Sequence, residues 1–256
     1  MGNYRPPEYG RSILKQRIED AENAGVDVNL NVVMELGPGR SLAAPISALL
    51  DGANLAITMD AVSYFDRSET LHAFDELVKN VEISEQRAAV LRDAVSKVGT
   101  PGQETLLKYV APWNDASAVA PDSVDFIFSI SVLEHVTDPD TVYRSCFRWL
   151  RPGGVMAHKI DHSSHGITRH WNGQYWVADW LWRLVLGGRP YAINRWIPDD
   201  HRAAAERAGF EVVSHECVAN ENDDSALYRE WPRGRFATVP RDSLFVTTST
   251  IVLRKA

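Results

Sequence analysis

A carboxylate before a glycine turn and a second carboxylate further along the chain stand in an order that suits a bound nucleoside. The segment Glu35–Gly39 reads ELGPG and ends an apolar run. Glycines at such a turn let the backbone bend sharply and let a ligand approach the peptide plane. Asp60 ends the next apolar run, 21 residues after Gly39. A carboxylate there accepts hydrogen bonds from both hydroxyls of a ribose.

The charge at this turn narrows the choice of ligand. A dinucleotide site favours a third small residue early in the following helix, and Leu42 stands there instead. Glu35 would repel a pyrophosphate, whereas it suits a ligand with an ammonium and a sulfonium group. The residues therefore favour S-adenosylmethionine (SAM) over NAD. The structural alternatives are a solvated strand-end carboxylate for Glu35 and a helix cap or turn residue for Asp60.

A second group of polar side chains follows two later apolar runs. Glu134 and His135 come shortly after the run 124–130, and the segment 158–165 reads HKIDHSSH. Ligands of open α/β sheets collect at the carboxyl ends of the strands. Both segments are therefore expected beside the nucleoside site, where a second substrate would react.

The histidines of this group favour acid–base chemistry. A hydroxyl that attacks a methyl group has to lose its proton, and a placed base accelerates such a step by about 10²–10⁴-fold. Histidine titrates near neutrality and is the natural base. We predict His165 as the base, Asp161 as its partner and His162 as the alternative base.

Other roles for these side chains stay open. His158 alternates with apolar neighbours and is as compatible with a hydrogen-bonded core position as with the site. His135 suits either a structural role or a place near the acceptor. Histidine and carboxylate both ligate divalent ions, which makes a group of His158, Asp161 and His165 conceivable. Its spacing matches no metal signature, so no metal site is predicted.

The elements that must position these residues alternate between strands and helices, which predicts an α/β, doubly wound, mostly parallel sheet. Helical periodicity marks the intervening segments, with Ser84 and Asp138 as predicted N-caps. The last two strands follow a helix and suit an antiparallel hairpin. The seven predicted strands cover residues 31–36, 55–59, 105–110, 124–130, 155–160, 210–218 and 243–253.

The alternation pauses once, which defines an insertion. Residues 161–198 hold five of the eight tryptophans. Aromatic side chains suit the apolar faces of sugar rings, although the same tryptophans also suit the packing of a cap. We predict a single domain over 1–256, with an N-terminal helical cap at 1–30 and a substrate-side aromatic insertion at 161–198.

Three motifs in this order resemble a known family. Residues 33–39 (VMELGPG), 124–136 (VDFIFSISVLEHV) and 150–154 (LRPGG) are similar to the class I SAM-dependent methyltransferases, in particular the broad methyltransferase-11-like group. The resemblance covers roughly residues 30–160. It implies a Rossmann-like sheet, SAM as cofactor and methyltransferase activity.

The resemblance also implies roles for individual residues. In such proteins the positions of Glu35, Gly37 and Gly39 line the methionine part of the cofactor. The position of Asp60 holds the ribose. The implied cofactor residues are completed by Ser129 and Ser131, expected beneath the cofactor.

The adenine contacts are expected just after the third predicted strand, where family members usually carry an acidic or polar residue. Trp113 or Asn114 is predicted to meet the adenine there, by stacking or through its amine. Trp113 is equally compatible with an ordinary core position.

A further likeness concerns the acceptor. The pieces Ile160–Asp161 with His165, and 194–195 with 208–210, resemble a subgroup linked to sugar and polysaccharide methylation. We predict O-methylation of a saccharide or small-metabolite hydroxyl by direct displacement. The alternatives are methylation of a nitrogen or carbon in a small molecule, or a SAM-binding module without catalysis.

Composition limits the other function classes. The formal net charge of -7 argues against a general nucleic-acid binder, which normally carries a basic face. No apolar run approaches the ~20 residues that span a bilayer, and the N-terminus lacks the apolar core of a signal peptide. We therefore predict a cytoplasmic protein with a small-molecule or glycan acceptor and neither nucleic-acid nor membrane partners. The oligomeric state stays open.

Overall fold

A computed structural model describes residues 5–100, 106–113, 116–187, 192–220 and 232–256. These residues form a seven-stranded sheet with helices on both faces. The strands are β1 (Val32–Leu36), β2 (Leu55–Met59), β3 (Leu107–Val110), β4 (Val124–Ile130), β5 (Leu150–Asp161), β6 (Glu211–Ala219) and β7 (Val246–Arg254).

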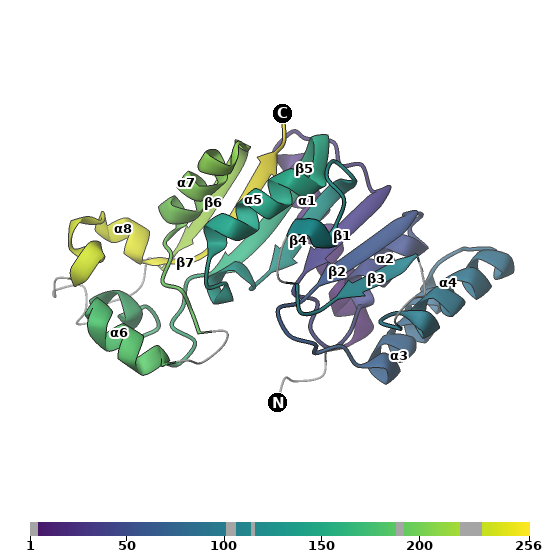
Figure 1. Cartoon of the computed structure of the whole chain (residues 1–256), viewed down its shortest axis with the longest axis horizontal. Helices are drawn as coiled ribbons and strands as arrows, with labels where there is room; N and C mark the ends of the chain where they lie inside the picture. The colour runs from purple at the N-terminus through teal and green to yellow at the C-terminus, as the bar shows by residue number, and fades with distance from the viewer. Residues whose placement is uncertain (1–4, 101–105, 114–115, 188–191, 221–231) are drawn as a thin grey trace.

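The sheet has the strand order β3-β2-β1-β4-β5-β7-β6. The pairs from β3 to β5 are parallel, whereas β7 runs antiparallel to both β5 and β6. This arrangement confirms the predicted mostly parallel, Rossmann-like sheet that ends in an antiparallel hairpin. Since β1 and β4 are neighbours in its centre, the turns that follow them open at the same edge (Figure 1).

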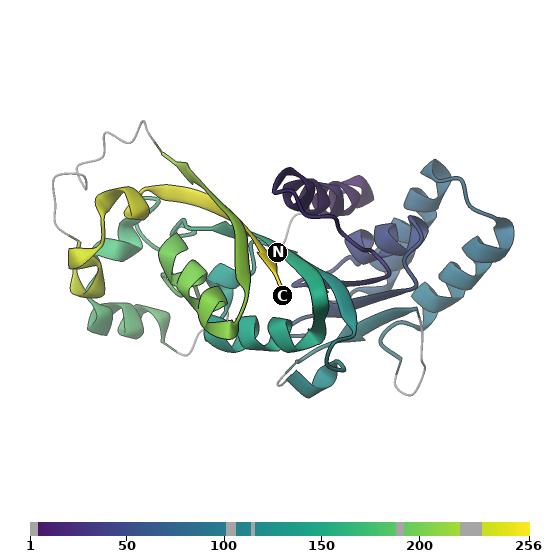
Figure 2. The same cartoon turned by 90° about the horizontal axis from the view of Figure 1, so that it is seen from above.

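Helices cover both faces of the sheet, with α1 and α2 on one side and α5 and α7 on the other (Figure 2). None of the described helices is long and apolar enough to cross a membrane. The α-helices are α1 (Pro7–Asn23), α2 (Ala43–Leu50), α3 (Arg67–Leu77), α4 (Glu85–Lys97), α5 (Pro139–Trp149), α6 (Asp179–Leu186), α7 (Pro198–Ala208) and α8 (Arg241–Leu244). Single 3₁₀ turns lie at Val78–Asn80, Ala116–Ala118, Leu133–His135, Gly173–Trp176 and Gly234–Thr238.

The core has two layers because the central strands are buried on both faces, as parallel strands usually are. Along β4, Phe126 and Phe128 face the α1–α2 side. Ile127 between them joins the cluster on the α5–α7 side, together with Trp149 of α5. The alternation of side chains along a strand thus fixes which polar residue enters which layer.

Most predicted element ends agree with the structure, and two strand starts do not. Ser84 and Asp138 are N-caps as predicted, since their side chains accept hydrogen bonds from the amides of Arg87 and Thr141. β5 begins at Leu150 rather than 155, because the RPGG segment continues the strand. β7 begins at Val246 rather than 243, because α8 precedes it.

Most tryptophans of the insertion pack against other side chains of the protein. Trp171 and Trp176 lie edge-on against Phe245, at ring-centroid distances of 6.4 and 6.0 Å. The guanidinium of Arg195 lies 5.1 Å from the centre of the buried Trp182 ring and forms an ion pair with Asp179. These contacts favour the packing role that the sequence left open for the tryptophans.

A group of buried histidines lies between β5 and α7. The Nδ1 atom of His158 is 2.7 Å from the hydroxyl of Ser129. His201 of α7 is 3.2 Å from the hydroxyl of Tyr143, and its ring centre is 6.0 Å from that of His162. Burial lowers the pKa of His158 to about 3 and that of His162 to about 4. These two imidazoles are therefore neutral in the folded protein at neutral pH.

The burial of His158 predicts a pH-dependent contribution to stability. Its folded pKa lies below the unfolded value of 6.5, so the unfolded chain gains a proton that the fold excludes as the pH falls below 6.5. The parent protein therefore loses about 1.4 kcal/mol of unfolding free energy per pH unit at this site, and His158→Gln does not.

Urea unfolding at pH 7.5 and pH 5.5 measures this difference. The cost of His158→Gln relative to the parent is expected to shrink by about 1 kcal/mol at the lower pH. His72→Gln, at an exposed position on α3, is the matched control and should show no such change. An equal cost of His158→Gln at both pH values would contradict the assignment of a neutral buried imidazole.

Candidate active site

The turn after β1 has the geometry that its glycines predict. Gly37 and Gly39 have φ values of 69° and 71°, in the left-handed region that disfavours side chains. A Cβ at Gly37 would collide with the side chain of Val132, whereas a Cβ at Gly39 would enter open space. The backbone at Gly39 is therefore accessible to a ligand. A glycine is required at position 37 because the loop after β4, which carries Val132, approaches closely there.

Two carboxylates, Glu35 and Asp60, flank this turn and are almost completely buried. Asp60 accepts hydrogen bonds from the Gly39 amide and, at 3.3 Å, from the hydroxyl of Tyr109. Burial nevertheless raises the pKa of Asp60 to about 6. The structure thus places three of the predicted cofactor residues side by side.

Of the two acids, Glu35 has the less favourable environment for a charge. Burial, and then the charge of Asp60, raise the pKa of Glu35 to about 8. Its Oε2 atom is buried without a hydrogen-bond partner. A site with two mutually repelling carboxylates and an unsatisfied oxygen suits a ligand that brings positive charge and hydroxyl donors. The residues present therefore fit SAM, with its ammonium, sulfonium and ribose groups.

The other predicted cofactor residues differ in where they lie and in what they contact. The hydroxyl of Ser129 is engaged with His158 in the core, and Ser131 is exposed with φ 51° at the end of β4. Trp113 donates its amide to the Asp60 carbonyl at 3.2 Å, and its ring packs edge-on against Trp149. These contacts give Ser129 and Trp113 structural roles, and their contacts with a cofactor stay predictions.

The predicted adenine residue Asn114 lies outside the described residues. Its neighbour Trp113 lies three residues after the end of β3 and is half-buried. The segment after β3 thus lies beside Asp60, on the side where the adenine is expected.

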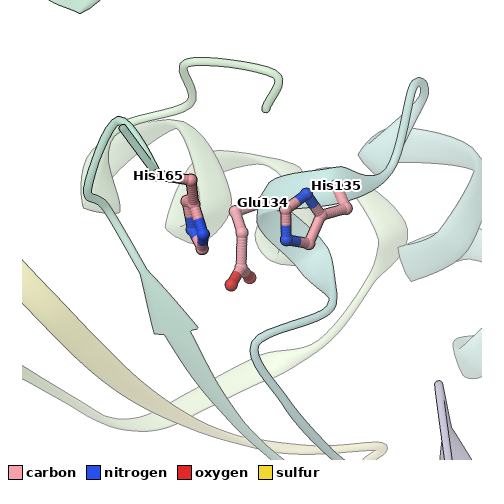
Figure 3. A group of neighbouring side chains, drawn as sticks. All are labelled: Glu134, His135 and His165. Carbon is pink, nitrogen blue, oxygen red and sulfur yellow. The ribbon is translucent and has the colours of Figure 1, made fainter. Parts of the chain in front are cut away.

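On the acceptor side, three polar side chains converge from the ends of β4 and β5. Glu134 and His135 belong to the 3₁₀ turn after β4, and His165 lies in the loop after β5, with φ 49°. One ligand atom of each residue lies within 4.8 Å of the others. Figure 3 shows the three side chains directed toward one another. The predicted partner Asp161 lies beside them, its Oδ2 atom 3.7 Å from Nε2 of His165.

Glu134 carries the most unusual electrostatics of this cluster. It is 4% exposed, and burial raises its pKa to about 8. The hydroxyl of Ser131 and the backbone amides of Glu134 and Asp161 come close enough to oppose that rise. None of these groups is oriented to donate a hydrogen bond to the carboxylate. Both carboxylate oxygens of Glu134 are therefore buried without a hydrogen-bond partner. The sequence predicted that the segment of Glu134 and His135 lies beside the acceptor, and it assigned no specific role to Glu134.

A residue far along the chain holds this turn in place. The side chain of Asn194 donates hydrogen bonds to the carbonyls of Leu133 and Val136, at 2.7 and 2.9 Å. Its backbone N–H donates to the backbone carbonyl of Glu134 at 2.8 Å. Three hydrogen bonds from one residue fix the direction of Glu134 and His135. Asn194 is a positioning residue that the sequence indicated only through its resemblance to the sugar-methylation subgroup.

His162 and His158 do not join the cluster. The Nδ1 atom of His162 lies 3.1 Å from the carbonyl of Trp196, and its Nε2 atom lies 2.9 Å from the hydroxyl of Ser249. Positions 158, 160 and 162 share one face of the extended chain and are buried, whereas 161 lies on the opposite face. The conceivable metal group of His158, Asp161 and His165 is therefore not brought together.

Part of the chain is similar in sequence to known methyltransferases. Residues 66–158 match the family described as a methyltransferase domain. A ubiquinone biosynthesis O-methyltransferase of Cereibacter sphaeroides is 27% identical over 107 residues, which are 40% of this chain and 40% of that relative. A trans-aconitate 2-methyltransferase of Azoarcus sp. is 31% identical over 125 residues, 47% of each chain. The matched region thus spans less than half the length of these curated relatives.

Solved structures extend the likeness to the whole fold. A geranyl diphosphate methyltransferase in complex with SAM matches with a TM-score of 0.54 and 11% identity, over 98% of this chain and 85% of that one. A Haemonchus contortus phosphoethanolamine N-methyltransferase in complex with S-adenosylhomocysteine matches with a TM-score of 0.51 and 15% identity, over 99% of this chain and 54% of that one. The central residues of this chain are therefore similar in sequence, and its whole sheet is similar in fold, to SAM-dependent methyltransferases.

Proposed function

We propose that this protein is a SAM-dependent methyltransferase that acts on a hydroxyl of a small molecule. The observation that carries the proposal is the pair of buried carboxylates at the glycine turn. Glu35 has an unpartnered oxygen, and Asp60 lies across from it at the end of the next strand. Such a pair favours a cationic ligand with a ribose and disfavours a pyrophosphate.

In this proposal the residues of the chain bind and orient both substrates. Glu35 pairs with the ammonium group, the turn at Gly37 and Gly39 lets the backbone approach the amino-acid part, and Asp60 accepts from the ribose hydroxyls. SAM supplies a methyl group on a positively charged sulfur. Because the transfer is a single displacement, alignment of the acceptor with that methyl group provides most of the acceleration.

The acceptor is placed at the cluster of Glu134, His135, Asp161 and His165. An oxygen acceptor is supported by the presence there of side chains that handle protons and by the names of O-methyltransferase relatives. The sequence prediction that His165 is the general base, oriented by Asp161, is supported by the 3.7 Å separation of the two side chains. Nitrogen acceptors often need less help from a base, which makes His165 the residue that separates the two acceptor classes.

The class of hydroxyl acceptor depends on the aromatic insertion. The sequence predicts a saccharide acceptor from its likeness to a sugar-methylation subgroup and from the tryptophans of the insertion. Most of these tryptophans pack against other side chains, whereas Trp180 is 69% exposed. We propose that the chain works as one domain with residues 161–198 on the acceptor side, because the segment begins at the carboxyl end of β5. A saccharide or another small hydroxyl compound fits this arrangement.

Methyl transfer from labelled SAM to panels of hydroxyl and amine compounds tests the proposal. His165→Ala is expected to lower kcat for a hydroxyl acceptor by about 100-fold or more, because the proposed general base is lost. His170→Ala, on the same loop but outside the cluster, is the matched control and should keep nearly full activity. Full activity of His165→Ala would favour a nitrogen acceptor, and no transfer to any compound would favour a binding module without catalysis.

A further inference from the structure

We propose that Glu134, His135 and His165 form a binding site for one divalent first-row transition-metal ion, which holds the acceptor. The three side chains offer one carboxylate and two imidazoles, with ligand atoms within 4.8 Å of one another. Two histidines and one carboxylate are a recurring ligand set for iron, zinc and related divalent ions. Imidazole nitrogens make Mg²⁺ and Ca²⁺ poorer candidates, since these ions prefer oxygen ligands.

Glu134 gives the strongest reason for a cation at this place. Both of its carboxylate oxygens are buried and lack an aligned hydrogen-bond donor. Burial of a carboxylate without a partner is strongly unfavourable. A divalent ion bound between Glu134 and the two imidazole rings supplies the missing partner.

The geometry requires little movement. Metal–ligand bonds of about 2.0–2.2 Å place neighbouring ligand atoms about 3–4 Å apart. Glu134 and His135 are held on one turn by Asn194. His165 is exposed, so a shift of its ring by about 1 Å completes the set. The ring centres of His135 and His165 already lie 4.9 Å apart.

Asp161 completes the surroundings of the site. Its Oδ2 atom faces Nε2 of His165 at 3.7 Å, which leaves Nδ1 of that ring as the ligand atom. Histidines that bind metals commonly donate their other N–H to a carboxylate, which orients the ring and raises its basicity. Asp161 is itself held by a hydrogen bond of 2.8 Å from the Ser163 amide. Asp161 is thus a positioning residue for His165.

The consequence for the reaction rests on the proposed methyltransferase function. Three protein ligands leave open positions on the ion, and two neighbouring oxygens of an acceptor fit them. The ion lowers the pKa of a bound hydroxyl, whose proton passes to solvent. The oxygen then forms a bond to the methyl carbon as the carbon–sulfur bond breaks, which yields a methyl ether and S-adenosylhomocysteine.

The proposal changes the role of one residue and narrows the acceptor class. His165 acts as a ligand rather than as the general base, because its Nδ1 binds the ion and its Nε2 faces Asp161. The favoured acceptors carry two adjacent oxygens, such as vicinal hydroxyls or a hydroxyl beside a carbonyl. A compound with a single isolated hydroxyl is expected to be a poor substrate.

Titration of Mn²⁺ into the chelator-treated full chain, followed by the loss of the free Mn²⁺ signal in electron paramagnetic resonance, tests the site without SAM. We expect one ion per chain. Glu134→Gln and His165→Asn should weaken binding about 100-fold or more, and Asp161→Asn about 10-fold. His72→Gln on α3 is the control and should bind as the parent does. A titration with Zn²⁺ by calorimetry should give the same order of variants.

The outcomes separate this proposal from the function on which it rests. S-adenosylhomocysteine binding with no Mn²⁺ or Zn²⁺ binding, or equal metal affinity in parent and His165→Asn, overturns the metal site and leaves the methyltransferase proposal standing. Metal binding without S-adenosylhomocysteine binding supports the site and overturns the methyltransferase proposal. Because His165 is exposed, His165→Asn is expected to fold even if Glu134→Gln does not.

Discussion

Replacement of Glu35 by glutamine is expected to stabilise the ligand-free protein by roughly 2–4 kcal/mol at pH 8 and to weaken SAM binding at least ~100-fold. The folded pKa of Glu35, about 8, lies above the ordinary value of 4.5. Above pH 4.5 the unfolded chain has released a proton that the folded chain retains, so the parent loses stability as the pH rises toward 8. Glutamine has no charge to bury and escapes this loss.

The same change removes the charge that the ligand requires. A hydrogen bond to a charged group contributes about 1.5–3 kcal/mol, and a 100-fold loss of affinity corresponds to about 2.7 kcal/mol. Urea unfolding at pH 5 and pH 8 and calorimetric titration with S-adenosylhomocysteine measure the two effects. Glu82→Gln, at an exposed position, is the control. Unchanged affinity in Glu35→Gln would show that this carboxylate does not bind the amino-acid part.

Alanine at Gly37 is expected to destabilise the protein by about 2–4 kcal/mol, and alanine at Gly39 by about 1 kcal/mol. Both positions have a positive φ, which disfavours a side chain by a similar amount. Only at Gly37 does a Cβ also collide with another side chain, that of Val132. The difference between the two variants therefore measures the packing of the glycine turn against the loop after β4.

Binding should not follow stability in this pair. A Cβ at Gly39 enters open space beside Asp60, which is where the ligand is proposed to lie. Gly39→Ala is therefore expected to keep most of its stability and to lose S-adenosylhomocysteine affinity by about 10-fold or more. Urea unfolding and calorimetry on both variants measure this. If Gly39→Ala bound the ligand as tightly as the parent, the ligand would not lie against this turn.

The fold, and the meeting of Glu35, Asp60 and the glycine turn, could be predicted from the sequence because both depend on local patterns. The glycine turn, Glu35 and Asp60 lie at the ends of apolar strands, and parallel strand ends meet at one edge of a sheet. The helix caps at Ser84 and Asp138 likewise depend only on residues a few positions away in the chain. For such features, the spacing along the chain is sufficient to predict position.

The acceptor half depends on contacts between distant segments. His165 is separated by about thirty residues from Glu134, and Asn194 holds the turn from further still. The order of strands and helices predicts that the segments of Glu134 and His165 both lie at the carboxyl edge of the sheet, but it does not predict which side chains touch there or that Asn194 joins them. The sequence also proposed His162, which lies in the core. Alternation along β5 was an available signal, since 158, 160 and 162 share the buried face and 161 does not.

The glycine turn with Glu35 and Asp60 is proposed to bind SAM rather than a dinucleotide. Calorimetric titration of the purified protein with S-adenosylhomocysteine, with NAD as the comparison ligand, compares the two candidate cofactors. We predict a dissociation constant below about 100 μM for S-adenosylhomocysteine and no measurable heat with NAD. Binding of NAD alone, or of neither ligand, would contradict the account.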